Sequence, residues 1–163
     1  MTLPPHQLWD YYRHMGIEAL RAFFAPRQKE TAPSHPDPVT VAACALLLEI
    51  AHADDVFRPE ERDRIARHIR DEMHVSEDEV AEVFRIAEEE RRESVDLFHF
   101  TQLLRENLDR DQRLRLVEAI WGVVYSDGTL LEVEAHLARR IAELLGFQHP
   151  EVQAVKDRVA ASR

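Results

Sequence analysis

The sequence predicts an all-α fold, namely a compact domain of about eight helices with an internal duplication of a helix–loop–helix unit. Three observations lead to this prediction. Ala, Leu, Glu and Arg are abundant and only 4 of the 163 residues are Gly, a composition that favours helix. Apolar residues recur at spacings of three and four, and no segment alternates convincingly with period two. A similar segment also occurs twice in the chain.

The N-terminal part is predicted to be a helix over residues 4–24 followed by a linker. Leu8, Tyr12 and Met15 begin an apolar stripe at helical spacing. The prolines that follow remove donors that a helix interior needs; they are Pro26, Pro33, Pro36 and Pro38. We therefore divide the chain into residues 1–37, a helix with a proline-rich linker, and residues 38–163, the main helical domain, which we expect to fold alone.

Seven further helices are expected from Pro38 onward, the first of them over about 38–53. Their starts carry proline or capping residues: Pro59, Ser76-x-x-Glu79, Asp96, Asp109, Thr129-x-x-Glu132 and Pro150. Gly146 is expected to end the helix before the last one. Cys44 and Trp121 lie on apolar helical segments, so both are predicted core residues.

The repeated segment is the most informative feature. Residues 47–61 (LLEIAHADDVFRPEE) align with residues 120–134 (IWGVVYSDGTLLEVE). The alignment pairs the acidic and turn residues of the two copies: Asp54 with Asp127, Asp55 with Gly128, and Glu61 with Glu134. Gly reaches positive φ without steric cost, and Asp tolerates the left-handed region better than most residues. The same turn is therefore expected in both copies, at some energetic cost in the first.

The segments AHADDVFRPEERDRI and VYSDGTLLEVEAHLARRIAELLGF resemble the two signature segments of TerB-like tellurite-resistance proteins. The intervening SVDLFHFTQLL resembles an uncharacterised bacterial branch of that group, and the resemblance spans roughly residues 38–150. It implies a compact all-helical fold with approximate two-fold symmetry and an association with stress-response or metal-related systems. It implies no enzymatic activity.

The paired carboxylates have two interpretations. The resemblance implies metal binding at Asp54, Glu61, Asp127 and Glu134, and Asp55 adds a carboxylate, so these five residues are the candidate metal site. Carboxylates and loop carbonyls suit a hard divalent cation, Ca²⁺ or Mg²⁺. In the structural interpretation, the carboxylates instead accept hydrogen bonds from loop and helix N–H groups.

Charge and motifs narrow the classes of partner. A net charge of −10 disfavours nucleic acid and favours cations or a protein partner with a basic patch. No signal peptide is recognisable, and the longest apolar stretch, residues 39–53, is too short to span a bilayer. We expect a cytoplasmic protein without membrane insertion.

The leading hypothesis is a non-enzymatic TerB-like module that binds divalent cations weakly or docks a partner protein. No phosphate-binding loop, zinc motif or nucleophile elbow is present. The alternative is a carboxylate/histidine metal enzyme, because Glu49-x-x-His52 has the spacing found in di-iron proteins. Gly122 and Tyr125 occupy the matching positions of the second copy, so the repeat does not support that alternative.

Overall fold

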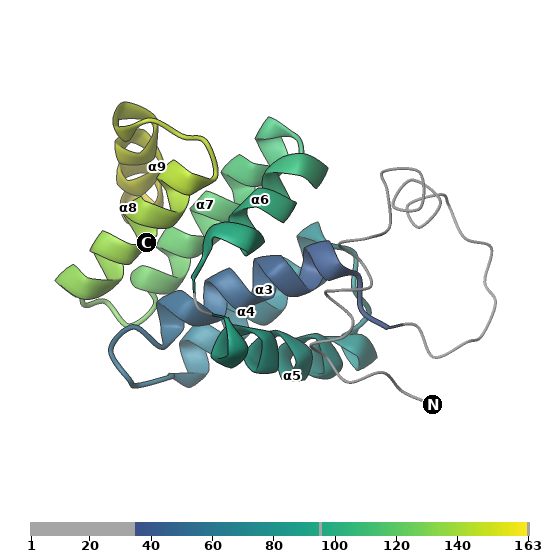
Figure 1. Cartoon of the computed structure of the whole chain (residues 1–163). Helices are drawn as coiled ribbons and strands as arrows, with labels where there is room; N and C mark the ends of the chain where they lie inside the picture. The colour runs from purple at the N-terminus through teal and green to yellow at the C-terminus, as the bar shows by residue number, and fades with distance from the viewer. Residues whose placement is uncertain (1–34, 95, 163) are drawn as a thin grey trace.

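The computed structural model describes residues 35–94 and 96–162, and these form seven α-helices without a β-strand (Figure 1). The helices are α3 (Pro38–Ala51), α4 (Pro59–Glu72), α5 (Glu77–Glu93), α6 (Phe98–Asn107), α7 (Arg110–Val124), α8 (Glu132–Leu144) and α9 (His149–Ala161). The all-α prediction is confirmed, with seven helices in the described ranges rather than about eight. The helix predicted over residues 4–24 lies outside those ranges.

Helix α3 is the central element of the fold. It packs against α4, α5, α6, α7 and α8, and Figure 1 shows it running through the middle of the bundle. Of its 14 residues only Glu49 is not buried. A helix that is apolar on nearly all sides must be surrounded by other elements. Cys44 is fully buried on α3, and that burial raises the pKa of its thiol, so it is a core residue as predicted.

Helix α7 is the second long core element and contacts α3, α4, α8 and α9. Trp121 is fully buried on it, as are Val117 and Ile120. The predicted core role of Trp121 is therefore confirmed. The C-terminal helix α9 covers α7 and α8, so the helices that follow the second turn enclose one side of the core.

Several helix starts follow from local sequence signals. The Asp37 side chain accepts a hydrogen bond from the Val39 N–H at 3.0 Å and caps α3. Helix α4 has Pro59 at its first position. Helix α5 has the predicted capping box, in which the Ser76 N–H donates to the Glu79 carboxylate at 3.1 Å.

The end of α8 was also predicted. Gly146 has a φ of +96°, and the next residue, Phe147, donates its N–H to the Ala142 carbonyl at 3.1 Å. This left-handed residue stops the helix, as expected for glycine at this position.

The start of α8 differs from the prediction. The capping box expected at Thr129 and Glu132 is not formed, because the Thr129 N–H donates to the Asp127 side chain at 2.8 Å. This bond keeps the chain in the turn, so α8 begins at Glu132 with Leu131 as its N-terminal cap residue. Glu134 is therefore the third residue of α8.

None of the described helices combines the length and the apolar character needed to cross a membrane.

Candidate functional site

The two predicted turns have the same backbone hydrogen bonds. After α3, the N–H groups of His52, Ala53 and Asp55 donate to the carbonyls of Leu48, Ile50 and His52 at 2.9, 3.1 and 3.1 Å. After α7, the N–H groups of Tyr125, Ser126 and Gly128 donate to the carbonyls of Trp121, Val123 and Tyr125 at 3.0, 3.0 and 3.2 Å. Every donor and acceptor in the second set corresponds to one in the first set under the sequence alignment.

Both turns also place a residue in the left-handed region. Asp55 has a φ of 61° and Gly128 a φ of 84°, so Asp55 adopts the conformation expected from the alignment. The Asp before each of these residues accepts an N–H two positions on: Val56 donates to Asp54 at 3.1 Å, as Thr129 does to Asp127. Both aspartates therefore stabilise their own turns.

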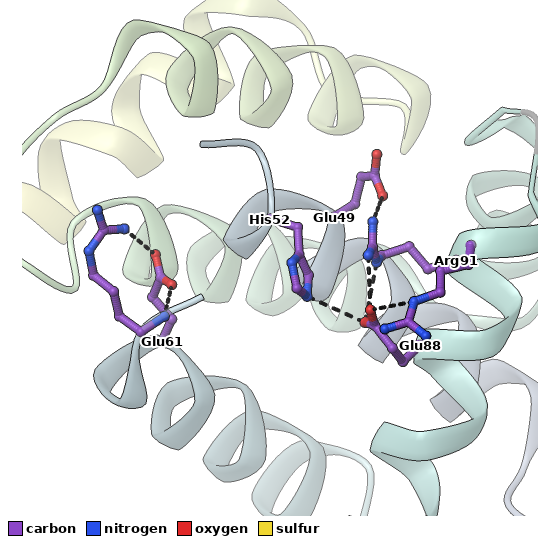
Figure 2. Close-up of polar contacts among 7 residues, drawn as sticks. Glu49, His52, Glu61, Glu88 and Arg91 are labelled. Atoms are coloured by element: carbon purple, nitrogen blue, oxygen red, sulfur yellow. Dashed lines mark hydrogen bonds and ion pairs between the residues drawn. The ribbon is translucent and has the colours of Figure 1, made fainter. Parts of the chain in front are cut away.

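The two glutamates lie at matching positions in α4 and α8 but have different surroundings. Glu61 accepts the backbone N–H of Arg58 at 2.8 Å, which satisfies a donor at the start of α4 (Figure 2). Glu134 is only 2% exposed, and within the described ranges no hydrogen bond reaches its carboxylate. Leu131 occupies the position that corresponds to Arg58, so Glu134 has no arginine of its own.

The Arg58 side chain joins the two turns. Its Nη2 lies 2.8 Å from Asp54 Oδ2, its Nε lies 3.3 Å from Asp127 Oδ2, and its Nη1 lies 3.5 Å from Glu61 Oε1. Its Nη1 also donates to the Val56 carbonyl at 3.2 Å. One guanidinium therefore contacts carboxylates from both turns. We call Asp54, Glu61, Asp127 and Glu134 the acidic cluster.

The carboxylates of the acidic cluster differ in the direction of their pKa shifts. Desolvation acts to raise the pKa of Asp54, but hydrogen bonds from Arg58 and from the Val56 N–H outweigh it and lower that pKa. Burial raises the pKa of Glu61, despite its hydrogen bond to Arg58. For Glu134, burial first and then the nearby Asp54, Glu61 and Asp127 carboxylates raise the pKa to about 7. Glu134 therefore titrates near neutral pH.

A family model described as tellurite resistance protein TerB matches residues 40–157. The chain belongs to the TerB family. This match confirms the resemblance that the two signature segments carry. A crystallised protein of unknown function from Porphyromonas gingivalis has a similar structure, with a TM-score of 0.57 and 15% sequence identity over 83% of this chain and 98% of that one. At that identity the likeness shows a shared fold. No curated protein sequence gives a significant match.

The structure of this TerB-family chain brings four of the five predicted metal ligands into one neighbourhood around Arg58. Asp55 is the exception, because its side chain is exposed at the edge of the turn. Within residues 35–94 and 96–162, no three His, Cys, Asp or Glu side chains are arranged to hold a metal ion. Arg58 supplies the positive charge that the sequence-based interpretation assigned to a cation.

Sequence reasoning missed Arg58. A signal was available, because Arg58 follows Asp54 by four residues and precedes Glu61 by three. Such spacings allow ion pairs along a chain that enters a helix. Its contact with Asp127, in contrast, depends on the packing of α4 against α7 and could not be deduced from local spacing.

The second candidate site was Glu49-x-x-His52, the motif of the alternative metal-enzyme hypothesis. In the structure Arg91 lies between Glu49 and Glu88. Its Nη1 is 3.2 Å from Glu49 Oε2 and its Nη2 is 2.9 Å from Glu88 Oε1. His52 Nε2 lies 3.4 Å from Glu88 Oε2, and Figure 2 shows these contacts converging on Glu88. Glu49 is thus engaged with Arg91, and His52 is engaged with Glu88. Asp96, which was predicted at a helix start, accepts the Phe98 N–H at 2.8 Å just before α6.

Proposed function

We propose that this TerB-family chain is a non-enzymatic docking module that binds a partner protein at its two acidic turns. One observation carries the proposal. The described part of the chain has four exposed large hydrophobic residues, and three of them, Val56, Leu130 and Val133, lie in or directly after these turns. Their exposed fractions are 52%, 39% and 51%. Exposed apolar side chains gathered beside charges are typical of interaction sites.

The charge of the same surface defines the chemistry of the partner. Asp55 is exposed, and Asp127 is only partly neutralised because Arg58 is shared with Asp54 and Glu61. The surface is therefore acidic with apolar side chains between the charges. A complementary partner is a protein segment in which Lys or Arg residues flank apolar ones. The family description supports a partner from a stress-response or tellurite-resistance system.

A docking role also accounts for Arg58. By neutralising charge between Asp54 and Asp127, it holds the two turns side by side without metal. The matching hydrogen bonds of the turns support our further proposal that the two units arose by internal duplication. A duplicated turn presents two similar acidic loops to one partner.

The test uses photo-crosslinking from Val133 in extracts of the native host, followed by titration of the captured protein. Val56→Ser combined with Leu130→Ser should weaken binding at least about tenfold, because removing two interface anchors costs a few kcal/mol. Phe98→Ser is the matched control, since Phe98 is 60% exposed on α6, away from both turns in sequence. If Phe98→Ser abolishes binding while the turn variant retains it, the docking site lies elsewhere.

Divalent-cation binding is a second candidate, and Glu134 is the observation that favours it. A buried carboxylate beside three others gains from any cation that replaces its proton. Binding would require the Arg58 side chain to move away, so we infer weak affinity. Millimolar Ca²⁺, Mg²⁺ or Mn²⁺ should then raise the melting temperature more at pH 8 than at pH 6. Asp127→Asn should reduce that rise more than it reduces metal-free stability. If none of the three ions shifts the melting curve, the cation proposal fails and only the docking proposal remains.

A further inference from the structure

An open surface cavity of about 380 Å³ lies where the end of α3 meets α4 and α5. Its volume falls in the range, roughly 300–1,000 Å³, that is usual for pockets binding small molecules. Apolar side chains from three segments line it: Leu48 on α3, Phe57 before α4 and Phe84 on α5. Leu48 and Phe84 are buried in the core, so this part of the wall is fixed by packing.

The rest of the cavity wall is rich in arginine. Arg62 from α4 and Arg85 and Arg92 from α5 all line it. Three guanidinium groups around one small cavity are unexpected in a chain with a net charge of −10. The overall field of such a protein repels anions, so a local site for an anion must be built from specific side chains.

The three arginines are not equivalent. Arg85 is held by Glu82 at 2.7 Å and Glu89 at 2.9 Å, and Arg92 lies 3.2 Å from Glu88. Arg62 has no carboxylate within ion-pair distance in the described part of the chain. Its guanidinium carbon instead lies 4.5 Å from the centroid of the Phe84 ring. The exposed Arg62 side chain thus lies against an aromatic face, and its guanidinium has no carboxylate partner among the described residues.

Glu88 is the acidic residue in the cavity wall, and its charge is already engaged. Its two oxygens contact Arg91, Arg92 and His52 at distances between 2.9 and 3.4 Å (Figure 2). Those contacts leave Glu88 little capacity to compete for Arg62. His52 in turn lies against Phe57, with 5.0 Å between the ring centroids. These two rings form an aromatic part of the cavity wall next to the charged part.

We propose that this cavity binds a small organic anion, a carboxylate or phosphate monoester attached to a flat apolar group. The planar guanidinium of Arg62 matches the two oxygens of such an anionic group and can donate two parallel hydrogen bonds. The flat group then lies against Phe57, the half-buried aromatic side chain of the wall, while Leu48 and Phe84 form its buried base. The cavity adjoins the proposed docking surface at the loop between α3 and α4, but it uses other side chains, so neither proposal depends on the other.

The experiment titrates the full chain with 2-naphthoate and follows backbone amide shifts by NMR. The expected shifts concentrate at Ala81 and Phe84 and at the start of α4. Arg62→Gln should weaken binding at least about tenfold, because a charged bidentate contact is lost. Arg67→Gln is the matched control, since it removes the same charge from an exposed position of α4 outside the cavity, and it should leave the affinity unchanged.

Two further probes separate the parts of the site. Neutral 2-naphthalenemethanol tests the apolar wall without the anion, and acetate tests the anion without the flat group. Both should bind more weakly than 2-naphthoate. Equal binding of the neutral probe, unchanged affinity in Arg62→Gln, or no shift at Ala81 and Phe84 would each overturn the proposal. Circular dichroism of each variant checks that its helix content is retained.

Discussion

Arg58 Nε lies 3.3 Å from Asp127 Oδ2, and this contact joins two turns that are far apart in the sequence. The same guanidinium contacts Asp54 at 2.8 Å. In a cluster of four carboxylates it is the internal counter-ion, so its removal should expose their mutual repulsion.

Arg58→Gln should therefore lower the melting temperature, and more at pH 8 than at pH 5. Glu134 is largely ionised at pH 8 and largely protonated at pH 5, so the uncompensated repulsion is greater at the higher pH. Thermal unfolding of the variant and the natural chain at both pH values measures this difference. Arg67→Gln controls for general loss of positive charge from α4. An equal loss at both pH values would mean that Arg58 acts through packing alone.

Glu134→Gln should stabilise the protein at pH 8 by about 1–2 kcal/mol, less than the full value of the pKa shift because water screens the neighbouring carboxylates. The folded pKa of about 7 lies above the ordinary glutamate value of 4.5, so the native state binds more protons between these values. Ionisation of Glu134 therefore lowers stability as pH rises from about 4.5 to 7 and has no further effect above. Burial lowers the pKa of His68 to about 4, and this second group raises stability as pH rises from about 4 to 6.5, against the Glu134 contribution. Urea denaturation of both chains isolates the Glu134 contribution as their difference, so Glu134→Gln should gain stability relative to the natural chain as pH rises from about 4.5 to 7.

Asp55→Gly should stabilise the first turn by about 0.5–1 kcal/mol, because Asp55 has a φ of 61° and glycine adopts that conformation without strain. Gly128→Ala should destabilise the second turn by about 1–2 kcal/mol for the same reason. Asp55→Asn separates conformation from charge, since it keeps left-handed tolerance while removing the carboxylate. Chemical denaturation measures all three variants. A loss of stability in Asp55→Gly would show that the Asp55 carboxylate contributes more than its backbone strain costs.

Trp121→Ala should cost about 3–5 kcal/mol, the usual range for a buried large aromatic residue. Trp121 is fully buried on α7, and its indole N–H has no hydrogen-bond acceptor in the described structure. Trp121→Phe should therefore cost less, because it retains an aromatic ring and removes an unsatisfied donor. An unchanged denaturation midpoint in Trp121→Ala would contradict the burial.

Removing residues 1–30 should leave a protein that still melts cooperatively. The helices from α3 to α9 form one apolar core among themselves, and both turns lie within it. Circular dichroism and calorimetry of the truncated chain test this boundary. Loss of all helical signal would show that the removed segment is an integral part of the core.

The fold was predictable where local signals decide the structure. Pro59, the Ser76 capping box and Gly146 each mark a helix end by their own chemistry, and each prediction holds. The Thr129 capping box was wrong because two local signals compete there and the Asp127 turn takes the Thr129 N–H.

The acidic cluster was predictable only in part. The repeat identified the four carboxylates, but the distance between the two turns depends on how the helices pack. The role of Arg58 follows from that packing, whereas the absence of an equivalent arginine beside Glu134 can be read from the alignment, which pairs Arg58 with Leu131. The metal and docking roles remain predictions.

The burial of α3 has a consequence for biosynthesis. This helix leaves the ribosome early, yet its neighbours include α6, α7 and α8, which are made later. Until those helices are synthesised, one side of α3, the most apolar segment in the described chain, is exposed to solvent. A nascent chain halted before α7 therefore exposes an apolar surface of the kind that chaperones bind. The native structure must form late, after most of the sequence has been synthesised.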